Sequence, residues 1–228
     1  MFISAFPAGP LAANCYVVAA AADRGAECVV VDPGQDAAGQ LSALLAEHGL
    51  TPAAVLLTHG HFDHVWSATE VARDHGVPVY VHAADRPLLT DPAKGLDPAL
   101  AAQLSALLGQ VGLEEPDDLR ELAGGETLAL AGMELRVEHV PGHTPGSVCY
   151  GLAPGGAEPI LFTGDLLFAG SIGRTDFPGG DHGEIMRSLE RVCSDWADTT
   201  GVRPGHGPQT TIARERATNP FLGDIPGR

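Results

Sequence analysis

Long hydrophobic runs and basic residues are what this sequence of 228 residues lacks. No apolar stretch reaches the roughly 20 residues that a membrane-spanning helix needs, so we expect no membrane attachment. Residues 1–10 contain neither a basic segment nor a long apolar one, so we expect no secretory signal and a cytoplasmic location. Lysine and arginine number 13 against 29 aspartates and glutamates, a formal net charge of −16. Because an acidic surface repels phosphate backbones, no nucleic-acid partner is expected.

Cysteines are also few, and no two of them form a CxxC pair. The chain has Cys15, Cys28, Cys149 and Cys193. This spacing argues against a structural zinc knuckle and against a disulfide scaffold. Neither is needed, because a chain of this length with 44% hydrophobic residues can bury a sizeable core unaided. No clear linker interrupts the sequence, and we expect one domain over residues 1–228.

Strand-like and helical patterns alternate along the chain, which predicts an α/β fold. Buried strands are predicted over residues 29–31, 53–57, 77–82, 126–130, 133–140, 147–151 and 159–163. Helices are predicted over residues 37–48, 65–75, 96–113 and 185–196, and a last helix begins near Thr211. Glycines close the first two helices, Asp181 provides a capping signal for the fourth, and Pro220 stops the last.

Histidines in loops carry the chemistry that the sequence suggests. Five of the ten follow strand-like runs in segments rich in Gly, Pro or Asp, namely His59, His61, His64, His143 and His206. His59 and His61 are two residues apart, so on an extended segment their rings point the same way and can reach one cation. The side chains of Asp63 and His64, at the start of the next helix, point in a different direction from those two rings and suit a second cation. A shared carboxylate such as Asp165 can bridge the pair, and imidazole with carboxylate suits zinc, iron, manganese or cobalt.

The motifs that contain these residues resemble the metallo-β-lactamase superfamily. They are THGHFDH (58–64), PGHTPG (141–146), TGD (163–165) and PGHGP (204–208), in family order. The resemblance implies a four-layer αββα sandwich with the metals at one edge of two sheets. It further implies the ligand sets His59, His61 and His143 for one metal, Asp63, His64 and His206 for the other, and Asp165 as the bridge. Two divalent ions are expected, with zinc first and iron or manganese as alternatives.

Two longer segments look like small bacterial glyoxalase II-like hydrolases. They are GDLLFAGSIGRTDFPGGD (164–181) and PGHGPQTTIARERATNPFL (204–222). The resemblance implies hydrolysis of S-acyl thiol adducts such as S-lactoylglutathione. It also implies that antibiotic hydrolysis is not the activity, because true β-lactamases of this fold have no Asp where Asp165 stands. Glyoxalase II carries a Lys and a Tyr that contact the thiol, where this chain has Arg174 and Asp176, and only 22 residues follow His206. The thiol carrier therefore stays open.

Two alternatives remain beside the thioester hydrolase. GRTDF (173–177) also resembles the persulfide dioxygenases of this fold, which bind one iron through two His and one Asp. The second alternative is a non-catalytic metal-binding member of the fold, against which the complete ligand set argues.

In the favoured hypothesis a metal-held hydroxide attacks the acyl carbonyl, and Asp63 is the catalytic residue that orients it. Thr58 is a candidate for a supporting hydrogen bond. Arg174 binds a substrate carboxylate or pairs with Asp176. Tyr150, with Phe168 and Phe177, lines the substrate pocket or packs in the core.

Overall fold

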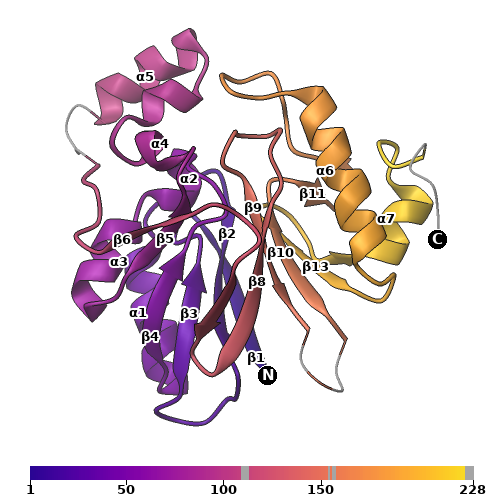
Figure 1. Cartoon of the computed structure of the whole chain (residues 1–228). Helices are drawn as coiled ribbons and strands as arrows, with labels where there is room; N and C mark the ends of the chain where they lie inside the picture. The colour runs from indigo at the N-terminus through magenta and orange to yellow at the C-terminus, as the bar shows by residue number, and fades with distance from the viewer. Residues whose placement is uncertain (109–112, 154, 156–157, 224–228) are drawn as a thin grey trace.

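Two six-stranded sheets face each other in the computed structural model, which describes residues 1–108, 113–153, 155 and 158–223 (Figure 1). The first sheet has the strand order β1 (Phe2–Ala8), β2 (Ala13–Ala19), β3 (Glu27–Val31), β4 (Thr51–Leu56), β5 (Val79–His82) and β6 (Leu119–Leu122). Its first three strands are antiparallel, and β3 to β6 run parallel. The carboxyl ends of the parallel strands therefore meet at one edge, where side chains from distant segments can converge.

The second sheet also has six strands but is mostly antiparallel. Its strand order is β14 (Thr210–Thr211), β13 (Gly201–Pro204), β10 (Ile160–Gly164), β9 (Val148–Leu152), β8 (Met133–His139) and β7 (Thr127–Leu130). The pair β10–β13 is parallel, and the other neighbours are antiparallel. A short hairpin, β11 (Leu167–Phe168) with β12 (Ser171–Ile172), follows β10.

Helices cover the outer face of each sheet. Figure 1 shows α1 (Ala37–His48) and α3 (Ala68–His75) beside the first sheet, and α6 (His182–Asp195) and α7 (Ile212–Thr218) beside the second. The side chains of β2 alternate between two layers, as a strand period of two requires: Val17 joins the cluster that includes α1, whereas Tyr16 packs between the sheets. A third apolar cluster joins the second sheet to α6 and α7. The three clusters fill the spaces between four layers, which confirms the expected αββα sandwich.

The helix predicted over residues 65–75 begins only at residue 68, and a separate short helix precedes it. Helix α2 (Phe62–Val65) ends before Ser67, and α3 begins after it. Ser67 is buried and its N–H donates to Pro33 O at 3.0 Å, while its hydroxyl accepts from Ala37 N–H at 3.2 Å. Long-range bonding to the segment before α1 therefore turns the chain at a position where the local pattern continues a helix.

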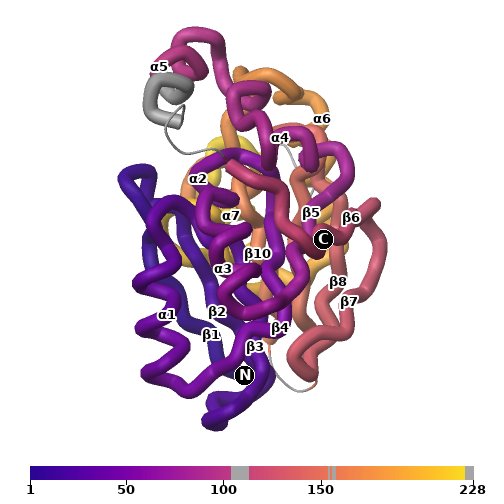
Figure 2. Tube along the Cα trace, turned by 90° about the vertical axis from the view of Figure 1, so that its left-hand side faces the viewer, coloured from indigo at the N-terminus to yellow at the C-terminus, as the bar shows by residue number. Residues whose placement is uncertain are grey.

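A helical excursion rises beyond the sheet edge between β5 and β6. It comprises α4 (Arg86–Thr90), the 3-10 helix η1 (Pro92–Gly95) and α5 (Pro98–Leu108), which Figures 1 and 2 both place above the sheets. Helix α5 matches the core of the helix predicted over 96–113, and residues 109–112 lie outside the described chain. Across the described ranges, no helix is both long enough and apolar enough to cross a membrane.

Candidate metal centre

Four loops at one edge of the two sheets deliver the seven predicted ligands. The loop after β4 carries His59 and His61 and leads into α2 with Asp63 and His64. The other three loops follow β8, β10 and β13 and carry His143, Asp165 and His206. The strands run toward this edge from both sheets, so residues up to 147 positions apart come together.

The first group consists of His59, His61 and His143, whose ligand nitrogens lie within 4.8 Å of one another. His61 Nδ1 is 2.9 Å from His143 Nε2, and all three side chains are buried. Burial and the neighbouring His143 lower the pKa of His61 to about 3, and burial lowers the pKa of His59 well below its ordinary value. His59 and His61 are therefore neutral, which is the form of imidazole that binds a metal.

The second group consists of Asp63, His64 and His206, again with ligand atoms within 4.8 Å. His206 Nε2 lies 3.3 Å from Asp63 Oδ2, and His64 Nε2 lies 3.2 Å from His206 Nε2. Burial lowers the pKa of His64, but the carboxylates of Asp165 and Asp63 outweigh it and raise that pKa to about 10. A proton thus joins these groups when no cation is bound, and a divalent cation would replace it.

Asp165 lies between the two groups. Its Oδ1 is 3.5 Å from His64 Nε2, and its Oδ2 is 3.5 Å from His143 Nε2 and 3.7 Å from His206 Nε2. One carboxylate therefore reaches a member of each group, which is the arrangement that a bridging ligand requires.

Hydrogen bonds orient three of the histidine rings toward the centre. The Thr58 hydroxyl donates to Asp32 Oδ2 at 2.6 Å and so accepts from His59 Nδ1–H at 3.0 Å. His64 Nδ1–H donates to Asp32 at 3.0 Å, and His143 Nδ1–H donates to Arg174 O at 2.8 Å. Each ring therefore presents Nε2 to the cluster, with a free lone pair when the ring is neutral, and for His64 once a cation has replaced its proton.

The donor set fits divalent cations. His59 Nε2 and Asp165 Oδ1 are buried without a hydrogen-bond partner among the described residues. Unpartnered buried acceptors are costly unless a cation joins them, and nitrogen with carboxylate oxygen is the donor set that zinc and iron accept. The structure thus places a cluster of metal-binding side chains where the sequence predicted one.

Gly205 allows the second group to close. A Cβ atom at this position would lie 2.2 Å from Asp165 Oδ1 and 2.8 Å from His64 Cε1. Since real Cβ atoms do not approach so closely, any larger residue would displace two of the ligands.

The predicted substrate residues divide between the surface and the core. Arg174 forms a two-pronged ion pair with Asp176 at 2.7 and 2.8 Å, and its guanidinium lies 3.5 Å from the ring centre of Phe177. The ring of Phe177 is 6.2 Å from that of His61, so this group borders the centre. The prediction that Tyr150 binds substrate is wrong. Tyr150 is fully buried between the sheets, where its hydroxyl donates to Leu57 O at 2.8 Å. A side chain with no exposed surface packs the core and cannot line a substrate pocket.

Two buried aspartates were missed by the sequence analysis. Asp32 and Asp85 follow the carboxyl ends of β3 and β5, on either side of the His-bearing loop after β4. Each is a carboxylate directly after, or three residues after, a short buried strand, and that position is the one sequence feature that could have marked them.

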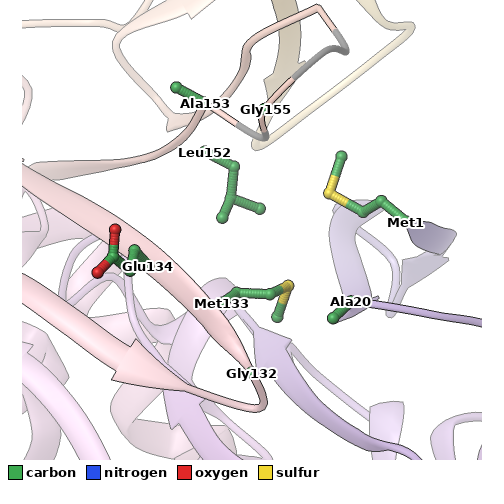
Figure 3. A pocket seen from close by; sticks show the side chains of 8 residues that line it. All are labelled: Met1, Ala20, Gly132, Met133, Glu134, Leu152, Ala153 and Gly155. Atoms are coloured by element: carbon green, nitrogen blue, oxygen red, sulfur yellow. The ribbon is translucent and has the colours of Figure 1, made fainter.

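A separate hollow of about 400 Å³ lies at the end of β2 that is far from the metal centre (Figure 3). Ala13, at the start of β2, bridges to His206 of the metal centre, whereas Ala20, just past its end, lines the hollow. Met133 and Leu152 point into it, and Glu134 contributes the one ionisable side chain among its described lining residues. None of the seven ligands belongs to it.

The fold and the site together define a metal-binding protein built as an αββα sandwich. The family model of the metallo-β-lactamase superfamily matches residues 8–203, and the chain belongs to this superfamily of metallo-hydrolases.

Several curated proteins are similar over almost their whole length. "Uncharacterized protein Rv2581c" of Mycobacterium tuberculosis is 48% identical, over 97% of this chain and 98% of its own. "Probable metallo-hydrolase YqgX" of Bacillus subtilis is 34% identical, over 95% of each chain. "Hydroxyacylglutathione hydrolase GloC" of Haemophilus influenzae is 32% identical, over 97% of this chain and 98% of its own.

Solved structures agree with the fold. One titled as the B3 metallo-β-lactamase BLEG-1 is 38% identical, with a TM-score of 0.81 over 97% of this chain and 99% of that one. TTHA1623 in a di-iron-bound form is 38% identical, with a TM-score of 0.77 over 97% of this chain and 100% of that one. ETHE1 from Myxococcus xanthus, 24% identical with a TM-score of 0.74 over 98% of this chain and 85% of that one, shares the fold.

Proposed function

We propose that this protein is a binuclear metallohydrolase that cleaves thioesters of a small thiol. The observation that carries the proposal is the pair of ligand groups with the Asp165 carboxylate spanning them. The similarity to a protein named as a hydroxyacylglutathione hydrolase supports the substrate class.

The proposed metals are two divalent ions, with zinc preferred for a site of imidazoles and carboxylates. His59, His61 and His143 would hold one, Asp63, His64 and His206 the other, and Asp165 would contact both. Bound there, the ions supply Lewis acidity and a water that is activated at neutral pH.

We assign Asp63 the orienting role in the reaction. Nearby His64 and His206 outweigh the effect of burial and hold the pKa of Asp63 well below its ordinary value, so its carboxylate is ionised and can accept a hydrogen bond from the attacking water. A thiolate leaves readily from a thioester, so no strong general acid is needed. The exposed Arg174 and the half-buried Phe177 border the centre and are the proposed contacts for the acyl or thiol part of the substrate.

The test combines metal analysis with a substrate panel for the full-length protein. We expect about two divalent ions per chain and release of free thiol from one or more acyl thioesters, including S-lactoylglutathione, without oxygen uptake. The His61→Ala variant should lose at least about 100-fold of this activity, whereas the same change at His75, exposed at the end of α3, should leave it unchanged.

Other outcomes would identify a different reaction. Oxygen consumption with glutathione persulfide and one iron per chain would assign the protein to the dioxygenase alternative. Turnover of a chromogenic β-lactam belongs in the panel, because a 38% identical structure is titled as a metallo-β-lactamase. Metal-replete protein that turns over no thioester in the panel would contradict the thioester proposal, whether or not it turns over the β-lactam.

A further inference from the structure

We propose that Asp85 is a positioning residue that fixes the first metal site by joining the two loops that carry its three histidines. Asp85 lies after β5, immediately before α4, and none of the seven ligands comes from this segment. Its side chain is fully buried, although a carboxylate is among the groups least often found in a protein interior. The inference rests on the metal-centre part of the proposed function and not on the substrate.

The carboxylate accepts three hydrogen bonds from two loops. Its Oδ2 accepts from Gly60 N–H at 2.8 Å and from the Thr144 hydroxyl at 2.7 Å, and its Oδ1 accepts from Gly146 N–H at 2.7 Å. Gly60 stands between His59 and His61, and Thr144 follows His143. Asp85 therefore contacts the immediate neighbours of all three ligands of the first group, and it links a loop of the first sheet to a loop of the second.

Asp85 packs closely against both loops at their glycines. A Cβ atom on Gly146 would lie 2.6 Å from Asp85 Oδ1, and one on Gly60 would lie 2.9 Å from Asp85 O. Ser147 Oγ lies 2.7 Å from Thr144 Oγ1, so the Thr144 hydroxyl can accept from Ser147 while it donates to Asp85. The two loops are thus held by short bonds to a group that cannot move away without leaving buried N–H groups unpaired.

The charge of Asp85 also points to a neighbouring cation. None of the ion pairs in the described chain includes Asp85. Its carboxylate acts on nearby His82, but burial lowers the pKa of His82 and leaves that ring neutral, so no cationic side chain balances Asp85 there. A buried carboxylate without a basic partner is costly, although N–H donors offset part of that cost. A divalent ion held by the adjacent three histidines would offset more of it, which couples the buried charge to metal binding.

Asparagine at this position tests the idea because it keeps the shape and removes one acceptor. The amide NH2 must replace either Oδ1, where it meets Gly146 N–H, or Oδ2, where it meets Gly60 N–H. In both orientations a buried N–H of a ligand-bearing loop loses its acceptor. The loop should then shift, and the histidines it carries should shift with it.

The measurement is cobalt(II) binding to the first site in the full-length chain. An Asp63→Ala, His206→Ala background removes two ligands of the second group, so that the cobalt absorption reports on the three histidines. We expect Asp85→Asn to weaken binding about 10- to 100-fold and to change the cobalt visible spectrum. Glu138→Gln is the control, because Glu138 is a buried carboxylate that accepts from Trp196 Nε1–H, pairs with Arg136 at 3.1 Å and forms no hydrogen bond with either loop in the described chain. Its Kd and spectrum should equal those of the background.

A milder variant covers the case in which Asp85→Asn does not fold. Thr144→Val removes one of the three bonds and keeps the side-chain shape, and we expect binding weakened about threefold or more. Unchanged cobalt affinity and spectrum in Asp85→Asn, or in Thr144→Val if that is the folded variant, would overturn the role of Asp85 alone. Failure of the unsubstituted protein to bind cobalt would overturn the metal centre as well, so the two failures are distinguishable.

Discussion

Replacing Asp32 with asparagine should disable the second metal site through the tautomer of His64. Asp32 Oδ1 accepts from Thr58 N–H at 2.7 Å, and Oδ2 accepts from the Thr58 hydroxyl at 2.6 Å and from His64 Nδ1–H at 3.0 Å. If the asparagine oxygen keeps the bond to Thr58 N–H, its NH2 faces His64 Nδ1. The imidazole proton must then move to Nε2, the nitrogen that faces Asp63, Asp165 and His206, and block the lone pair that binds metal.

The opposite orientation of the amide does not restore the site. Its oxygen could then accept from His64, but its NH2 would face Thr58 N–H and leave that buried donor unpaired. An unpaired buried group costs about 1–3 kcal/mol of folding free energy. Loss of such a supporting group typically weakens metal binding about 10- to 100-fold, which corresponds to about 1.4–2.8 kcal/mol of binding free energy.

The assay is zinc titration of the metal-free protein by calorimetry with a competing chelator. We expect Asp32→Asn to bind the second equivalent about 10- to 100-fold more weakly. The first equivalent should weaken as well, because a Thr58 hydroxyl that faces the amide NH2 would donate to His59 Nδ1 and move that ring's proton to Nε2. Asp36→Asn is the control, because Asp36 has a similar left-handed backbone (φ 58° against 50° for Asp32) but is exposed and its side chain makes no capping bond to α1. Since asparagine tolerates this conformation, backbone strain is matched between the variants. Two equivalents bound by Asp32→Asn with unchanged affinities would refute the tautomer argument.

Three further predictions test other parts of the structure. Gly205→Ala should reduce metal content to about one ion per chain by elemental analysis, because its Cβ would overlap Asp165 Oδ1 and crowd His64; two bound ions would contradict the close approach. Tyr150→Phe should lower the melting temperature by about 2–4 °C for the lost bond to Leu57 O and leave KM unchanged, and a raised KM with unchanged stability would return Tyr150 to the substrate site. All four cysteines are buried and burial raises their pKa values, that of Cys28 to about 12, so at pH 8 they stay protonated and should react with a thiol reagent only after unfolding; any fast-reacting thiol in the native protein would contradict this.

Features that depend on near neighbours could be predicted from the sequence. Helix α1 has the predicted bounds, and Gly49 closes it in the left-handed conformation. Asp181 accepts from Glu184 N–H at the start of α6, and Thr211 accepts from Arg214 N–H at the start of α7. Caps and helical periodicity act over three or four residues, so the local sequence contains all the information that they need.

The N-terminal strands β1 and β2 show where such reasoning stops. They were not predicted, although β2 is a central strand whose side chains pack in two layers. Their segments contain Pro, Gly and small residues, and their pairing depends on β3 and on the bond from Asn14 N–H to Gly205 O, nearly two hundred positions away. Strand formation is decided by partners that the local pattern does not contain.

The sequence alone pointed to all seven candidate ligands. The spacing of His59, His61, Asp63 and His64 suggested a metal site, and the resemblance of the motifs to the metallo-β-lactamase superfamily implied the complete set. Only the tertiary structure decided that Asp165 spans both groups, that Asp32 sets the ring of His64 and that Asp85 joins two loops from different sheets. It also moved Tyr150 from the substrate pocket to the core. These contacts join residues 22 to 101 positions apart, and they exist only because strands of two sheets end at the same edge.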